Sequence, residues 1–155
     1  MENGQEVFRR ELLEALQETF ESHHGIYLDK GTSLFETLDG ISSVEASQPV
    51  GGQCASLAAQ VAHVTFYLEI LERHMLRQEV GAVDWGEIWR TVQEVSAEEW
   101  TELRQQLVQT YRRIDATLHG LPTWDDENLI AGSLAILVHT AYHLGEIRQA
   151  LCTLR

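Results

Sequence analysis

Apolar side chains recur every three to four residues along four long stretches of this chain, which is the spacing of one buried face of an α-helix. The stretches cover about residues 5–23, 55–79, 96–118 and 123–152. In the first of them, Phe8, Leu12, Leu16 and Phe20 form the apolar stripe. No segment shows the sustained period-two alternation of a half-buried strand. The pattern therefore predicts four helices.

The sequence also carries start and stop signals for these helices. Ser96 and Glu99 stand three residues apart, as in a capping box at a helix N-terminus. Gly25 follows the first stretch and favours its end, because glycine adopts the left-handed conformation that closes helices. Residues 26–53 contain four glycines and one proline. They predict a long connection with short helical turns near residues 33–38 and Val44.

Four helices without a convincing strand imply an all-α fold, a four-helix bundle, within one domain covering residues 1–155. The long first connection argues against a plain up-down-up-down arrangement with minimal loops. We expect it to act as a crossover that lets the first two helices run parallel or pack diagonally.

Composition narrows the classes of partner. The chain has 24 acidic and 11 basic side chains and a formal charge of −13, and such a surface repels phosphate backbones and anionic lipids. We therefore expect neither nucleic-acid nor membrane binding. The first residues lack the basic and apolar regions of a signal peptide, and Cys54 and Cys152 form no CxxC motif. Both observations favour a reducing cytoplasm, with the two cysteines as small packing residues.

Two histidines four residues apart, His139 and His143, lie in an apolar part of the last predicted helix. On a helix they share one face about one turn apart, so both imidazoles can point at one atom. His63 lies among small residues in the second predicted helix, where another helix can approach closely. Imidazole is a frequent ligand of Zn, Ni, Cu and Fe. The three histidines predict a divalent metal site with open coordination positions, as in catalytic zinc sites.

Other interpretations of the same region stay open. A zinc-peptidase motif does not fit, because Thr140 stands where that motif needs glutamate. Glu146 shares the face of the histidine pair and is a candidate hydrogen-bond acceptor, fourth ligand or general base. Its alternative role is a surface acid paired with Arg148. Gln60, one turn before His63, is expected either to hydrogen-bond a bound water or to pack at the edge of the core.

The remaining histidines and the tryptophans give weaker signals. His74 lies on the same helical face as His63, but eleven residues separate the two by about 16 Å along a helix. One ion cannot contact both. We expect the tryptophans to plug the ends of the bundle, or one or two of them to line a ligand pocket beside the metal. They are Trp85, Trp89, Trp100 and Trp124.

Two segments resemble the DinB/YfiT-like superfamily of metalloenzymes. Residues 56–64, SLAAQVAHV, contain His63, and residues 138–149, VHTAYHLGEIRQ, contain the histidine pair. In that family a histidine on the second bundle helix joins an H-x-x-x-H pair on the last long helix. Its usual sequence after the first ligand is aromatic-His-Leu-Gly-acid/amide-Ile-Arg. The order and separation of the three histidines also match, and the resemblance extends over essentially the whole chain.

The resemblance implies a DinB-like four-helix bundle with a long first crossover, in which His63, His139 and His143 bind a divalent metal. Zn and Ni are the metals most often suggested in the family, ahead of Fe and Mn. The resemblance also implies a homodimer. Characterised relatives include thiol-dependent isomerases and bacillithiol-type S-transferases, which implies a low-molecular-weight thiol as the small-molecule partner.

Three hypotheses about function follow. The leading one is a metal-dependent enzyme with S-transferase-like or hydrolase-like chemistry, in which the cation lowers the pKa of a bound water or thiol. Glu146 is then the candidate base or orienting residue. The alternative is a non-catalytic helical bundle whose metal site is structural or ligand-binding. In the third, the three histidines are packed in the core and bind nothing.

Overall fold

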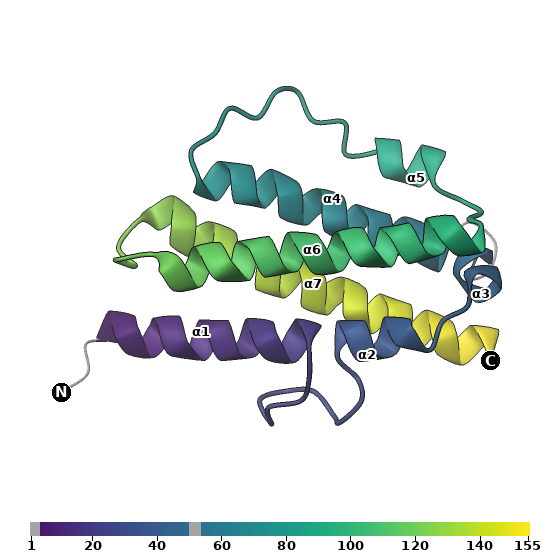
Figure 1. Cartoon of the computed structure of the whole chain (residues 1–155), viewed down its shortest axis with the longest axis horizontal. Helices are drawn as coiled ribbons and strands as arrows, with labels where there is room; N and C mark the ends of the chain where they lie inside the picture. The colour runs from purple at the N-terminus through teal and green to yellow at the C-terminus, as the bar shows by residue number, and fades with distance from the viewer. Residues whose placement is uncertain (1–3, 50–53) are drawn as a thin grey trace.

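A computed structural model describes residues 4–49 and 54–155 of the chain. The described residues form an all-α fold with no strand, apart from an isolated bridge between Pro49 and Ser56. Four of the helices are long and three are short (Figure 1). They are α1 (Gly4–Phe20), α2 (Leu34–Asp39), α3 (Ser43–Ser47), α4 (Leu57–Met75), α5 (Glu87–Thr91), α6 (Ala97–Gly120) and α7 (Glu127–Leu154).

The four long helices lie side by side, and the two that carry the histidines are direct neighbours (Figure 1). α1 packs against α6 and α7, and α4 packs against the same two helices. α1 and α4 therefore lie diagonally, which is one of the two arrangements predicted. α4 and α7 run in opposite directions, because Gln60 contacts His143 whereas Met75 lies against Gly132.

α4 and α6 run in the same direction although they are consecutive long helices in the chain. Glu69 accepts a hydrogen bond from Thr110, and Glu72 accepts from Arg113 three residues further along both helices. The connection of residues 76–96, which contains α5, therefore returns along the length of α4 before α6 begins (Figure 1).

Side-chain caps determine where α4, α6 and α7 start. Ser96 and Glu99 form the predicted capping box at the start of α6. Asp126 caps α7 by accepting a hydrogen bond from the backbone N–H three residues on. Because this cap places the first helical residue at Glu127, the predicted start at residue 123 was four residues too early.

α4 is shorter at both ends than the apolar pattern predicted. Ser56 accepts a hydrogen bond from a backbone N–H of the first turn, so the helix starts at Leu57 rather than at residue 55. It ends at Met75 rather than at residue 79, and Arg77 follows with a φ of 55°. That left-handed conformation cannot continue an α-helix.

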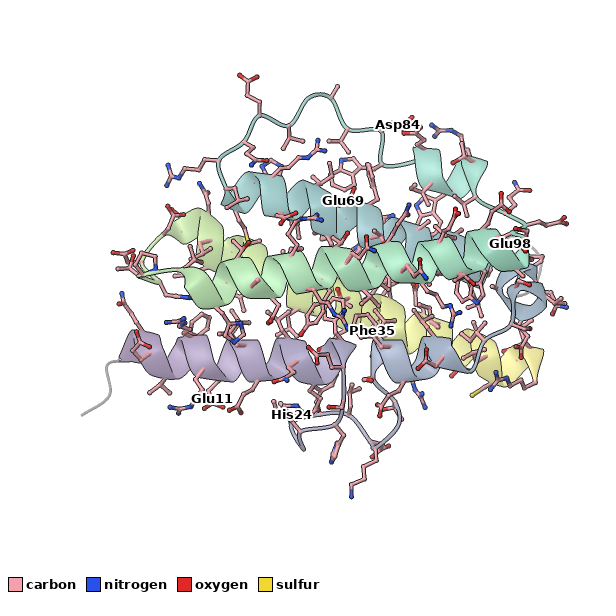
Figure 2. All side chains as sticks on the ribbon, viewed as in Figure 1. Glu11, His24, Phe35, Glu69, Asp84 and Glu98 are labelled. Carbon is pink, nitrogen blue, oxygen red and sulfur yellow. The ribbon has the colours of Figure 1, made fainter. Side chains whose placement is uncertain are left out.

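α1 ends at Phe20, three residues before its predicted end, because Glu18 binds the chain that follows. Glu18 is fully buried and accepts four hydrogen bonds of 2.6 to 2.9 Å from the backbone N–H groups of residues 24, 26, 27 and 28. His24 lies in this loop (Figure 2). Burial raises the pKa of Glu18, but the four hydrogen bonds outweigh it and lower the pKa to about 2. The carboxylate thus anchors the loop between α1 and α2.

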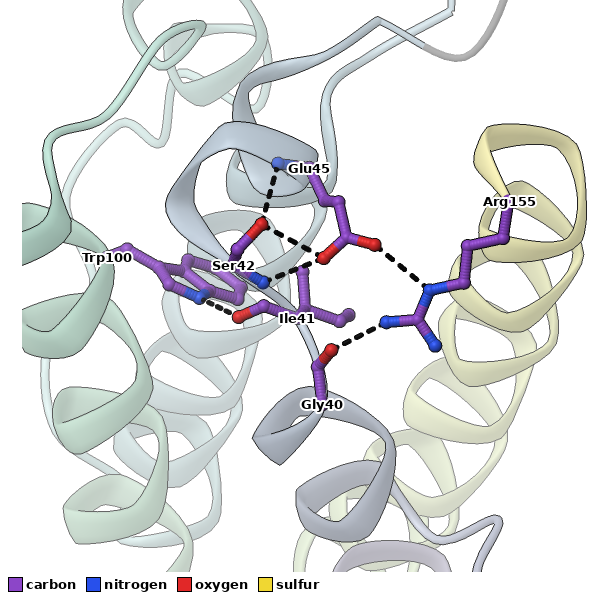
Figure 3. Close-up of polar contacts among 6 residues, drawn as sticks. All are labelled: Gly40, Ile41, Ser42, Glu45, Trp100 and Arg155. Atoms are coloured by element: carbon purple, nitrogen blue, oxygen red, sulfur yellow. Dashed lines mark hydrogen bonds and ion pairs between the residues drawn. The ribbon is translucent and has the colours of Figure 1, made fainter.

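The turn between α2 and α3 is tied to α6 and to the end of α7 (Figure 3). Trp100 donates its indole N–H to the carbonyl of Ile41 at 2.8 Å. Arg155 contacts the carboxylate of Glu45 at 2.9 Å and donates to the carbonyl of Gly40. Trp100 is buried, in line with its predicted role at the end of the helices.

Aromatic packing fills the space where α1 gives way to α2. Phe35 packs with Phe20 of α1 and Tyr111 of α6, at ring-centroid distances of 5.8 and 5.6 Å (Figure 2).

Cys54 and Cys152 are both exposed, so the prediction that they are packing residues was wrong. Cys54 precedes the cap of α4, and Cys152 lies on the solvent-facing side of the last turns of α7.

Among the described residues, no helix combines the length and the apolar character that crossing a membrane requires.

Candidate metal centre

The structure brings the three predicted histidines together between α4 and α7. Nε2 of His139 lies 3.2 Å from Nε2 of His63 and 3.2 Å from Nε2 of His143. One ring nitrogen from each residue lies within 4.8 Å of the others. His63 and His143 are 8% and 6% exposed, and His139 is half-buried. The three side chains are therefore close enough to hold one metal ion.

His143 is oriented by two acceptors on its other nitrogen. Nδ1 of His143 lies 2.6 Å from Oε1 of Gln60 and 2.9 Å from a carboxylate oxygen of Glu146. Since an amide oxygen and a carboxylate can only accept, Nδ1 carries the proton and donates it. Nε2 of His143 therefore presents a lone pair to the other two imidazoles. A metal-ligating histidine commonly has such an acceptor on its second nitrogen.

The electrostatics of the cluster keep its imidazoles neutral. Burial, together with the neighbouring His143, lowers the pKa of His63 to about 4. Burial and the two other imidazoles lower the pKa of His139 to about 3. Burial also lowers the pKa of His143, and Glu146 partly offsets this effect. Because a metal binds the neutral form of histidine, the cluster is in its binding form near pH 7.

The donor set and its spacing fit a first-row divalent cation. Two nitrogens that are each about 2.0–2.1 Å from one ion and at a tetrahedral angle lie about 3.3–3.4 Å apart. The two Nε2 separations of 3.2 Å in the cluster are close to that value. One proton at most can lie among three nitrogens at these distances, so most of the lone pairs have no donor. A cation would satisfy all three lone pairs at once.

Aromatic rings hold the other two histidines where hydrogen bonds do not. Nδ1 of His63 and Nδ1 of His139 are buried and have no hydrogen-bond partner among the described residues. Instead, Tyr67 stacks on His139 with centroids 3.5 Å apart and planes 8° from parallel. Trp89 packs on His63 at 4.4 Å. These rings restrict the orientation of both imidazoles.

Trp85 and Trp89 both come from the connection between α4 and α6. Trp85 packs against Phe66 and Tyr67, with ring centroids 5.9 and 5.7 Å away. Trp89 thus lies beside the histidines, whereas Trp85 contacts Tyr67 and not a histidine ring; a ligand pocket lined by either of them stays a prediction. Tyr67 was missed from the sequence, although it follows His63 by one helical turn and so shares its face.

The structure also distinguishes between the roles considered for the neighbouring polar residues. Glu146 contacts His143, and Arg148 donates to Thr37 of α2. Glu146 is thus a hydrogen-bond partner of the cluster rather than a surface acid paired with Arg148. Gln60 binds His143 directly, which neither of its predicted roles included. The exposed His74 lies outside the cluster, as its spacing predicted.

Comparisons with protein-family profiles, with curated proteins and with solved structures gave no match for this chain. The argument for function therefore rests on the geometry of the histidine cluster and on its surroundings.

Proposed function

We propose that this chain is a divalent-metal protein in which His63, His139 and His143 are the ligands. The observation that carries this proposal is the convergence of their Nε2 atoms, with two separations of 3.2 Å. The neutral form of the imidazoles supports it. The described residues offer three protein ligands, which matches the ligand number of catalytic rather than structural zinc sites.

We further propose that the chain is a DinB-like four-helix bundle with a long first crossover and one domain covering residues 1–155. The two segments quoted above support this assignment, as does the packing of α1, α4, α6 and α7 around a common core. A homodimer and a cytoplasmic location are further predictions, the first from the resemblance and the second from composition.

The leading function is that of a metal-dependent enzyme acting on a small molecule. A Zn or Ni ion, or failing these Fe or Mn, supplies Lewis acidity that makes a water or a low-molecular-weight thiol nucleophilic near neutral pH. Glu146 and Gln60 hold the proton on Nδ1 of His143 and so keep its Nε2 available. This arrangement favours Glu146 as a positioning residue over Glu146 as a general base.

A second candidate is a non-catalytic bundle in which the metal joins α4 to α7. The observation that favours it is the aromatic cover of the cluster, since Tyr67 and Trp89 lie directly on two of the imidazoles. A closed coordination sphere completed by protein groups would support this role. X-ray absorption on the metal-loaded protein, with and without added thiol, distinguishes the two candidates.

The first experiment is elemental mass spectrometry on tag-free protein after reconstitution with Zn or Ni. We expect about one equivalent in the wild type and none in His63→Ala. His74→Ala is the matched control, because it removes an exposed histidine from the same helix and should retain the metal. Full occupancy in His63→Ala, or no metal in the wild type, would refute the site.

A further inference from the structure

A cleft of about 500 Å³ opens between the start of α4 and the end of α7, directly beside the histidine cluster. Gln60 and Glu146 line it, and both also bind Nδ1 of His143. The cleft therefore lies on the Nδ1 side of His143, away from the point where the Nε2 atoms converge. We call it the α4–α7 cleft, and its principal lining residues are Leu57, Gln60, Tyr142, Gly145, Glu146 and Ala150.

The lining of the α4–α7 cleft combines an apolar surface with one charge. Leu57 and Ala150 are buried side chains that form its apolar part. Among the described lining residues, Glu146 is the one acidic side chain. Its side chain is 36% exposed, and its carboxylate accepts hydrogen bonds from His143 and Tyr142. No lysine or arginine neutralises it within the described lining.

Gly145 is a second sign that this space is for a ligand. Glycine is the least favourable residue other than proline in a helix interior, so its presence there calls for a reason. Gly132 has one in packing, since a Cβ at that position would clash with Cγ of Met75. A Cβ at Gly145 would meet no heavy atom within 4 Å. Packing within the chain therefore does not account for glycine there, and the missing side chain leaves this wall of the cleft open.

We propose that the α4–α7 cleft binds a small amphiphilic amine, with its ammonium group on Glu146 and its apolar part on Leu57 and Ala150. A cationic group complements the single carboxylate, and a short hydrocarbon part complements the apolar lining. The same carboxylate serves both His143 and the bound amine. The bound ammonium group therefore reduces the negative charge that Glu146 presents to His143, and this weakens metal binding. By reciprocity, the metal weakens amine binding.

In the binding test, metal-free protein is titrated with hexylammonium, and calorimetry measures the binding. We expect one site, with hexanoate and hexanol each bound at least ten times more weakly. Glu146→Gln should weaken hexylammonium binding at least tenfold, whereas Glu98→Gln, an exposed acid at the start of α6 (Figure 2), should change it less than twofold. Equal effects of the two variants would mean diffuse attraction to an acidic surface and would overturn the proposal.

A second pair of variants tests the location. Gly145→Leu fills the cleft and should abolish binding, whereas Gly145→Ala adds one carbon and should retain it. Unchanged binding in Gly145→Leu, with the helical circular dichroism of the wild type, would overturn the assignment to this cleft. Should Gly145→Leu not fold, amide NMR shifts of the wild type decide. Shifts confined to the residues around Leu57, Gln60 and Gly145 support the cleft, and shifts elsewhere overturn it.

The coupling between the two sites rests on the proposed metal function, whereas the binding test does not. We expect saturating hexylammonium to weaken Zn binding, measured by competition with a chromophoric chelator, by three- to tenfold. An unchanged Zn affinity would overturn the coupling. A wild type that binds no Zn would instead refute the metal site, and the titration of metal-free protein would still decide on the cleft.

Discussion

Glu18 and the histidine cluster are two places where this protein buries polar side chains, and they use their hydrogen-bonding capacity in opposite ways. The carboxylate of Glu18 receives four backbone N–H groups at 2.6 to 2.9 Å. In the cluster, three Nε2 atoms face one another, and no other described residue supplies a donor to them. A buried acceptor with a full set of donors stabilises the fold. Converging lone pairs without donors are available to a ligand from outside.

The comparison also indicates that the residues important for stability and those important for metal binding lie in different parts of the molecule. The partners of Glu18 are backbone groups of one loop, so its effect is confined to the path of the chain between α1 and α2. The partners of the histidines are side chains from α4, α7 and the connection that contains α5. Variants of the two places should therefore have opposite consequences for unfolding and for metal binding.

The largest expected effect is on the metal. His143→Ala should lower the metal affinity by at least about 1,000-fold, which corresponds to about 4 kcal/mol, because the residue supplies one of three ligands. The free energy of unfolding of the metal-free protein should change by no more than about 1–2 kcal/mol. Competition with a chelator measures the first quantity and urea unfolding the second. Full metal binding in His143→Ala would contradict the proposed difference between Glu18 and the histidine cluster.

Glu18→Gln should show the reverse behaviour. The amide can accept through one atom only, so at least two of the four backbone N–H groups lose their acceptor and the free energy of unfolding falls by about 2–4 kcal/mol. Metal affinity in the folded protein should stay within about twofold of the wild type. Glu14→Gln is the control, since Glu14 is exposed on the same helix. Equal stability of the two variants would show that the loop does not depend on the carboxylate.

The lowered pKa of Glu18 predicts how stability depends on pH. Because the pKa falls from 4.5 to about 2 on folding, ionised Glu18 stabilises the fold above pH 4.5. That contribution is lost as the pH falls from about 4.5 towards 2. Over this range the slope of unfolding free energy against pH should be up to about 1.4 kcal/mol per pH unit shallower in Glu18→Gln. Urea midpoints between pH 6 and pH 2.5 test this, and identical slopes would contradict it.

The smallest expected effect concerns the residues that orient His143. Gln60→Ala removes the acceptor at 2.6 Å and should weaken metal binding about tenfold, because Glu146 still holds the proton on Nδ1. Unfolding of the metal-free protein should change little. Gln78→Ala, at an exposed position just beyond α4, is the control. No change in metal affinity would assign Gln60 to packing alone.

The sequence was sufficient for the histidines but not for their surroundings. The spacing of His139 and His143 puts both on one face whatever the rest of the fold, and the small residues around His63 allow the close approach seen. The contact of Gln60 with His143 depends on how α4 is rotated and shifted against α7, and no local pattern encodes that. Glu18 gave no signal, because its partners are backbone groups and an acid in a helix is usually exposed.

Helix bounds follow the same distinction. The end of α1 was misplaced because it depends on Glu18, whereas the start of α6 was predicted because Ser96 and Glu99 form a local capping box. The start of α7 was placed too early because Asp126 acts as the cap and not as a residue of the first turn. Interactions between neighbouring residues can be predicted from the sequence, whereas interactions between distant segments cannot.

The positions of the three histidines along the chain have a consequence for biosynthesis. His63 and His139 are 76 residues apart in the chain, and α6 is made between them. In a polypeptide emerging from the ribosome, His139 is therefore made 76 residues after His63, and His143 follows it on α7. A contact between residues so far apart in the chain costs loop-closure entropy. An ion held by all three histidines could therefore bind only after α7 has been made, and could not be the nucleus around which the earlier helices first pack.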